Sequence, residues 1–190
     1  GSEMCIRDST IAERIEYYPS TENFGDPYKN YYKEDIYVGY RYFETFAKDK
    51  VLYPFGYGLS YTSFEYSDLK VEERENGNII AHVNVKNIGY RAGDEVVQLY
   101  VTDMYASVKT RITELKDFTR VHLRPGESKS ISFELTPYEL SLLNDNMDRV
   151  VEKGTFKILV GGVSPQYIAK DRIKDSLGYE DAQKGLSVMS

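Results

Sequence analysis

The sequence predicts an all-β fold, an antiparallel β-sandwich that follows an irregular, aromatic-rich segment. Residues 64–163 contain short runs in which apolar and polar side chains alternate, which is the period of a strand with one buried face. Turn-forming residues separate these runs, and no helical pattern of any length interrupts them. Several such runs within about 100 residues are typical of a two-sheet sandwich.

The strands follow from the alternation. In "NIIAHVNVKN", every second residue from Ile79 to Val85 is apolar. The same period places three further sets on an inward face: Val97, Leu99 and Val101; Ile131, Phe133 and Leu135; and Phe156, Ile158 and Val160. The first run, "FEYSDLKV", changes parity between Tyr66 and Leu69, which predicts a β-bulge.

Turn chemistry connects the strands. Pro125-Gly126 predicts a type II turn, in which proline presets φ and glycine takes the left-handed position. In "NIGYRAGD", we expect Asn87, Gly89 and Gly93 to supply positive φ. We expect a helical turn within "TPYELSLLND", and a polar tail over 164–190 that is weakly helical or unstructured.

Residues 10–63 hold more than half of the 18 tyrosines but show neither strand nor helix spacing. Rings without a period do not form one face of one element. They suit an irregular segment between two bodies, where glycine allows close approach and aromatic rings supply buried area. Residues 10–63 are therefore interpreted as a connector.

The first nine residues, "GSEMCIRDS", are expected to be a non-native scar, because back-translation matches a transposon end used in preparing sequencing libraries. Cys5, the single cysteine, lies within them. The remaining chain has no cysteine for a disulfide, a thiolate nucleophile or a zinc site.

Composition and motifs argue against several functions. A net charge of −6 disfavours nucleic acid as a partner, and no apolar run is long enough for a membrane span. The carboxylate pairs Glu34/Asp35, Asp94/Glu95 and Asp145/Asp148 are interpreted as solvated loop residues. His82 and His122 are interpreted as surface or cross-strand residues. No cofactor or metal motif is present, and "DNMD" is interpreted as a turn.

Five blocks carry a family resemblance: "IYVGYRYFET", "LYPFGYGLSYTSFEYSDLKV", "VKNIGYRAGDEVVQLYVTD", "ELKDFTRVHLRPGESKSISFELTP" and "GTFKILVGGVS". Their order and spacing resemble the C-terminal region of glycoside hydrolase family 3, over roughly residues 30–163. The resemblance implies an immunoglobulin/fibronectin type III-like sandwich at 64–163. It also implies that residues 10–63 connect the sandwich to a missing α/β sandwich domain.

The resemblance further implies a parent enzyme that is β-glucosidase-like, exo-acting and retaining, hydrolysing terminal β-linked sugars. Its nucleophilic Asp and acid/base Glu belong to absent domains, so no residue here inherits a catalytic role. The fragment is then expected to be inactive and to brace those domains, which would be its partners. The residues expected at this interdomain contact are Tyr40, Tyr42, Phe43, Tyr53, Phe55, Tyr57 and Tyr61.

An alternative remains open, a stand-alone sandwich that binds carbohydrate or a protein partner. In that case Tyr40, Tyr42, Tyr53 and Tyr57 would form a platform on which sugar rings stack. The absence of tryptophan from the chain weighs against a planar platform of this kind. The sequence leaves localisation, oligomeric state and the sugar undetermined.

Overall fold

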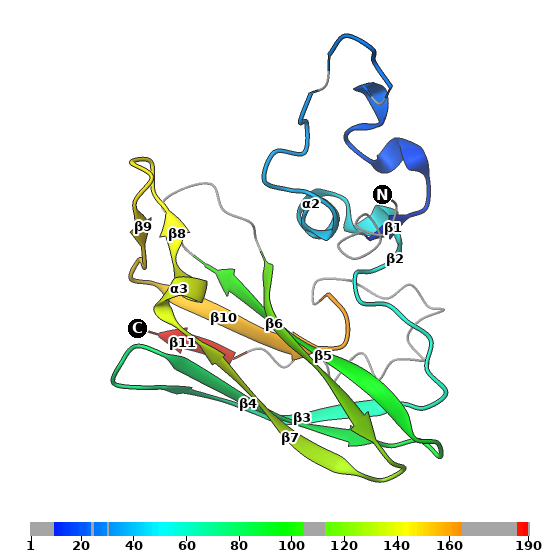
Figure 1. The fold of residues 1–190 in the computed structure, drawn as a ribbon, viewed down its shortest axis with the longest axis vertical. Coiled ribbons are helices and arrows are strands. Elements are labelled where there is room, and N and C mark those ends of the chain that lie inside the picture. The colour runs from blue at the N-terminus through cyan, green and yellow to red at the C-terminus, as the bar shows by residue number, and fades with distance from the viewer. Residues whose placement is uncertain (1–9, 24, 30, 105–112, 165–185, 190) are drawn as a thin grey trace.

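A computed structural model describes residues 10–164 and 186–189, apart from 24, 30 and 105–112. The expected scar at 1–9, with Cys5, and most of the tail therefore lie outside the described residues. Figure 1 shows a sandwich of strands and, on the outer side of one of its two sheets, the short helices of the N-terminal segment.

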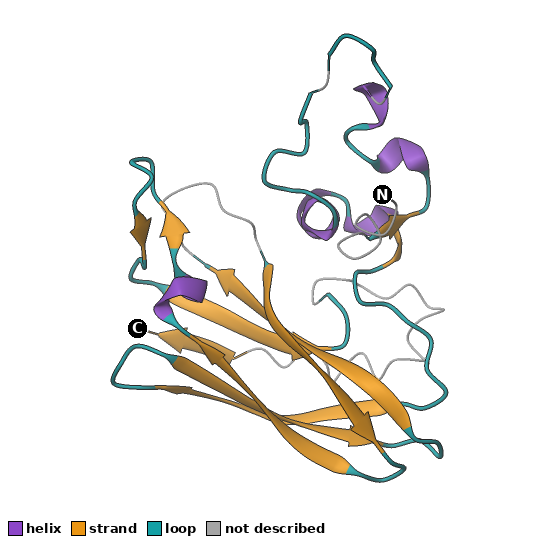
Figure 2. Cartoon of the chain, in the orientation of Figure 1, coloured by secondary structure: helices purple, strands orange, loops and turns teal. Residues whose placement is uncertain are grey.

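The sandwich has two antiparallel sheets (Figure 2). One has the order β3-β4-β7, with β3 at Phe64–Glu73, β4 at Ile79–Asn87 and β7 at Ser128–Leu135. The other has the order β11-β10-β5-β6, with β11 at Leu186–Met189, β10 at Thr155–Gly161, β5 at Gly93–Asp103 and β6 at Glu114–Leu123. The predicted all-β sandwich is confirmed.

The core lies between the sheets and consists of the alternating sets that the sequence indicates. Val85, Val97, Leu99, Leu135 and Ile158 are fully buried in it. Ile131 packs against this core while remaining partly exposed. The alternation therefore identifies the buried face of each strand correctly.

Two predicted irregularities are confirmed. The pairing of β3 with β4 shifts register between Ser67 and Lys70, and Asp68 has a φ of 55°. At the other site Gly126 has a φ of 75°, and the amide of Glu127 donates to the carbonyl of Arg124 at 2.9 Å. This is the geometry that a type II turn requires.

The expectation for the turn after β4 is wrong, because Asn87, Gly89 and Gly93 do not have positive φ. The glycines allow close approach instead. A Cβ at Gly89 would lie 2.2 Å from Thr62 Oγ1, and one at Gly93 would lie 2.8 Å from Thr62 Cγ2.

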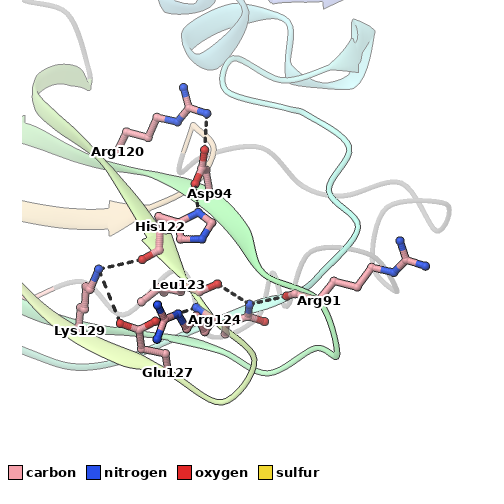
Figure 3. A network of polar contacts seen from close by, with 9 residues as sticks. Arg91, Asp94, Arg120, His122, Leu123, Arg124, Glu127 and Lys129 are labelled. Atoms are coloured by element: carbon pink, nitrogen blue, oxygen red, sulfur yellow. Dashed lines mark hydrogen bonds and ion pairs between the residues drawn. The ribbon is translucent and has the colours of Figure 1, made fainter.

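Asn87 is fully buried, and its side-chain amide forms hydrogen bonds with the residues around the turn. Its amide oxygen accepts from Thr62 and Gly89, and its amide nitrogen donates to the carbonyls of Arg91 and Leu123 (Figure 3).

Helical structure follows β7 as expected. α3 (Pro137–Leu140) begins with a capping box between Thr136 and Glu139 and leads into the hairpin of β8 (Leu142–Leu143) and β9 (Arg149–Val150). The tail differs from the prediction at its end, because Leu186–Met189 pairs with β10 as an added edge strand. The backbone N–H and C=O groups at the edge of β10 provide hydrogen-bond partners for this strand. The polar composition of the tail does not reveal such pairing.

The connector is more ordered than its sequence suggests. It contains β1 (Ile11–Ala12), η1 (Ile15–Tyr17), η2 (Thr21–Asn23), α2 (Tyr40–Phe46), η3 (Lys48–Lys50) and β2 (Val51–Tyr53). The prediction of no helical pattern is wrong at α2. Tyr40, Phe43 and Ala47 recur at the spacing of one helix face, and all three are buried.

Candidate interdomain contact surface

The connector has a small apolar cluster of its own. Phe43 and Ala47, from α2 and its end, pack with Ala12 and Val51 of the paired strands β1 and β2. The ring of Tyr18 meets Phe43 edge-on at 5.2 Å between centroids. The Tyr18 hydroxyl accepts from the amide of Ala12 and donates to the carbonyl of Thr10, at 3.0 and 2.9 Å. These contacts fold the start of the connector back onto its end.

A second cluster joins the connector to the outer face of the sandwich. Tyr40 is 2% exposed and packs with Tyr100 of β5 and Leu159 of β10. Phe55 stacks on the Tyr40 ring at 4.9 Å, and Tyr100 meets that ring edge-on at 6.2 Å. One face of α2 is therefore fixed to the sheet that contains β5 and β10.

The hydroxyl of Tyr40 forms a hydrogen bond close to a register shift between two strands of that sheet. The pairing of β5 with β6 shifts register between Leu99 and Tyr100, and near this shift the amide of Leu115 donates to the Tyr40 hydroxyl at 2.9 Å. Burial raises the pKa of Tyr40 above its usual value. A buried tyrosine usually pairs its hydroxyl, so this bond fixes the position of Tyr40 as well as stabilising it.

Polar bonds extend the attachment. Gln98 of β5, which is buried, donates to the carbonyl of Gly162 at 2.7 Å and accepts from the Tyr100 hydroxyl. The amide of Ser164 donates to the carbonyl of Phe55 at 2.9 Å. Gly56 is required beside this network, since its φ is 86° and a Cβ there would lie 2.4 Å from Gln98 Nε2.

The structure distributes the seven predicted contact residues over several environments. Tyr40 and Phe43 are buried by residues of this chain, whereas Tyr42, Phe55 and Tyr57 are half-buried. Tyr53 and Tyr61 are 39% and 90% exposed. Because the Tyr40 ring is buried, the four tyrosines considered as a carbohydrate platform do not form one exposed surface. Their contact with a further domain stays a prediction.

Sequence reasoning missed the surface that receives the connector, made chiefly by Tyr100, Leu159 and Gln98. A signal was present, because Tyr100 and Leu159 are large apolar residues at outward positions of strands whose inward positions were already assigned. Apolar residues on both faces indicate a strand covered on both sides. Elsewhere on α2, Phe46 remains 60% exposed, although its ring meets those of Tyr37 and Tyr42 at 4.9 and 5.6 Å between centroids.

Comparison with known proteins identifies this arrangement. The fibronectin type III-like domain family matches residues 95–164. Thermostable beta-glucosidase B of Acetivibrio thermocellus is 42% identical over 170 residues, which are 87% of this chain and 22% of that protein. Beta-glucosidase 3B of Thermotoga neapolitana, solved with glucose, superposes with a TM-score of 0.78 at 33% identity, over 95% of this chain and 24% of that one.

The chain is homologous to enzymes of glycoside hydrolase family 3. It corresponds to the C-terminal, fibronectin type III-like region of that family's β-glucosidases. A third relative, the GH3 β-glucosidase of Bifidobacterium adolescentis, gives a TM-score of 0.77 at 30% identity, over 95% of this chain and 25% of that one. The chain thus spans about a fifth to a quarter of the relatives that it matches.

The interpretation of Asp94 and Glu95 as solvated loop residues is wrong, because both lie on a strand and pair with neighbouring side chains. Asp94 of β5 binds Arg120 and His122 of β6 (Figure 3). Its neighbour Glu95 accepts from the Tyr66 hydroxyl. The His122 and Arg120 side chains hold the pKa of Asp94 below its usual value. The interpretation of His122 as a cross-strand residue is confirmed, since Asp94 is its partner in the ladder.

The other candidates also lie in turns or on strand surfaces. Glu34 accepts from Ser20 Oγ at 2.8 Å, and Asp35 has a φ of 52°. The "DNMD" stretch is a turn in which Asn144 accepts from the amides of Asn146 and Asp148. His82 pairs with Ser132 across β4 and β7. Among the described residues, no three His, Cys, Asp or Glu side chains gather as a metal site, and no helix is long and apolar enough to cross a membrane.

Proposed function

We propose that this chain is a non-catalytic part of a retaining, exo-acting β-glucosidase-like enzyme, in which it braces the catalytic domains. The parent would hydrolyse terminal β-linked sugars with two carboxyl groups supplied by other domains. Relatives named β-glucosidase and β-xylosidase support this assignment. So does the share of those relatives that the chain spans, about a fifth.

The observation that carries the proposal is the double attachment of α2. Tyr40 is anchored in the sandwich, and Phe43, one turn further along the same face of α2, lies in the connector cluster. Large apolar residues of the connector remain at least 39% exposed beyond these contacts, among them Ile15, Val38, Phe46, Leu52 and Tyr53. Several large apolar side chains left exposed on one segment favour an interface with another body. A bracing role assigns one side of the connector to the sandwich and the other to the catalytic domains.

Region exchange tests the role. Thermostable beta-glucosidase B of A. thermocellus is prepared intact, truncated at the matched region, and with that region replaced by residues 10–164 of this chain. We expect the chimera to hydrolyse an aryl β-glucoside and the truncated enzyme to lose activity or melt at lower temperature. Residues 10–164 alone should show no turnover.

Two variants of the chimera test whether the Tyr40 anchor is required for the stabilising effect. Tyr40→Ala removes the anchor in the sandwich and should lower the melting temperature of the catalytic part. Tyr90→Ala, at a tyrosine in the turn between β4 and β5 of the sandwich that is 99% exposed, is the matched control and should change little. A truncated enzyme that equals the chimera in activity and melting temperature would contradict the bracing role.

A further inference from the structure

A cavity lies where the connector passes the sandwich, away from the Tyr40 anchor. β10 ends at Gly161 opposite Gln98, so in the described part of the chain residues 93–97 of β5 have a strand neighbour on the β6 side only. The facing wall consists of connector residues between Gly56 and Ser63, together with Phe64 of β3, and the cavity has a volume of about 210 Å³. This is below the roughly 300–1,000 Å³ of pockets for drug-sized ligands, and it suits a molecule of about one ring.

Glu95 is the principal polar group of the cavity. Its side chain is half-buried, and Oε1 accepts from the Tyr66 hydroxyl at 2.5 Å. A Cβ at Gly162 would lie 2.3 Å from that oxygen, so the glycine leaves room for the carboxylate. Burial raises the pKa of Glu95, and the Tyr66 bond opposes part of that rise. A desolvated carboxylate of this kind gains from any further donor that reaches it.

The facing wall is held firmly and is apolar at its rim. Thr62 bonds to the buried Asn87 and packs against Gly89 and Gly93, with no room for a side chain at either glycine. Leu59, beside Ser60 in this wall, is 89% exposed and offers an apolar surface. A wall that is already positioned at Thr62 loses less conformational entropy when a ligand binds.

The charges restrict the class of ligand. Asp94, which also lines the cavity, is already paired with Arg120 and His122. A cation would find only Glu95 as an unneutralised carboxylate, whereas calcium takes six to eight oxygen ligands. An anion would meet two carboxylates. A neutral molecule with several hydroxyls can donate to Glu95 and place its C–H surface on Leu59 and Val96.

We propose that this cavity is a binding site for a neutral polyhydroxyl ligand of about one sugar ring, with the Glu95 carboxylate as its main acceptor. The site lies on the sandwich side of the chain and does not involve the exposed face of α2. Ligand binding is measured on this chain alone, so its outcome does not depend on the bracing role.

Titration of the isotopically labelled 190-residue chain with D-glucose, followed by two-dimensional amide NMR, tests the site. We expect saturable shifts of the Ser60, Glu95 and Val96 amides with a dissociation constant in the millimolar range, since the ligand is small. Glu95→Gln should weaken binding at least about tenfold, because it removes the charged acceptor. Leu59→Ala changes only an exposed side chain, so it should leave the fold intact and weaken binding severalfold.

Controls separate this site from alternatives. Glu65→Gln, at an exposed residue of β3, should bind as the unmodified chain does. Calcium chloride and sodium acetate should not produce the same saturable shifts. The proposal is overturned by the absence of saturation with glucose up to 100 mM, taken as roughly a hundredfold excess over a millimolar constant. The proposal would also be overturned if Glu95→Gln and Leu59→Ala bound glucose as tightly as the unmodified chain. Saturable shifts of the same amides on addition of calcium would overturn it as well.

Discussion

The sandwich and the connector are both rich in apolar residues, but they bury them in different ways. In the sandwich, two faces close on each other, and core residues such as Leu99 and Leu135 have no exposed surface. In the connector, Phe43 and Tyr40 are buried in two small clusters, while Tyr28, Tyr32 and Phe46 are 91%, 85% and 60% exposed. The sandwich thus buries its apolar residues in one closed core of its own. The connector buries its rings in a small cluster of its own and in a second cluster shared with the sandwich.

This difference has a consequence for how the chain unfolds. Regions with few buried apolar contacts open at lower free energy than a closed core. The Tyr40 anchor modifies the expectation from sequence, because it gives α2 a docking surface within the chain. α2 should therefore be more protected than the rest of the connector and less protected than the core strands.

The largest expected effect comes from truncating one core residue in each region. Leu99→Ala should lower the free energy of unfolding of the sandwich by about 2–5 kcal/mol, since it opens a cavity in a closed core. Phe43→Ala should instead speed amide exchange in α2 and leave the sandwich midpoint nearly unchanged. Chemical denaturation and hydrogen exchange by mass spectrometry measure the two effects.

The exchange pattern of the unmodified chain provides the control. Strand segments Ile79–Val85, Val97–Val101 and Ile131–Leu135 should be the most protected, and Thr10–Lys50 should exchange faster, with α2 the slowest part of it. Equal protection of the two regions would remove the distinction between them. In that case the connector would fold as part of the sandwich, and the proposed dependence on a further domain would fail.

A smaller effect is expected from a single turn of the sandwich. Gly126→Val should cost about 1–3 kcal/mol, because a β-branched residue resists a φ of 75°. Gly154→Val is a matched control. A Cβ at either glycine meets no atom within 4 Å, but only Gly126 has positive φ. Denaturation midpoints that fall equally in both variants would show that φ is not the cause.

The smallest effect concerns Glu95, which lies where the two regions meet. Burial raises its pKa in the folded chain above the ordinary value of 4.5. The folded state then holds a proton that the unfolded state has released, so the contribution of this group to stability falls as pH rises from about 4.5 to the folded pKa. Glu95→Gln cannot titrate.

The difference in unfolding free energy between the unmodified chain and Glu95→Gln should therefore decrease as the pH rises above the ordinary pKa of 4.5, and become constant above the folded pKa. Urea denaturation of both proteins across this range measures it. A difference that grows with pH would mean that the hydrogen bond from Tyr66 to the ionised Glu95 outweighs the effect of burial.

Sequence by itself determined the fold and the inward face of every long strand that it indicated, because alternation is a local property. It also determined the bulge in β3 and the turn at Gly126, where parity or a Pro-Gly pair records the geometry directly. The family resemblance was likewise readable from five blocks. These features depend on residues close together in the chain.

Only the tertiary structure decided the partners of the outward-facing residues. Tyr100 and Leu159 are buried because α2 and Phe55 cover them, and Tyr40 is placed by a backbone amide at Leu115, 75 residues away. Gly89 and Gly93 are needed for the approach of Thr62, and not for their own φ. Contacts between distant segments produce no periodic pattern in the sequence. The sequence of a segment shows which of its own side chains are apolar or small, but not which distant residue packs against them.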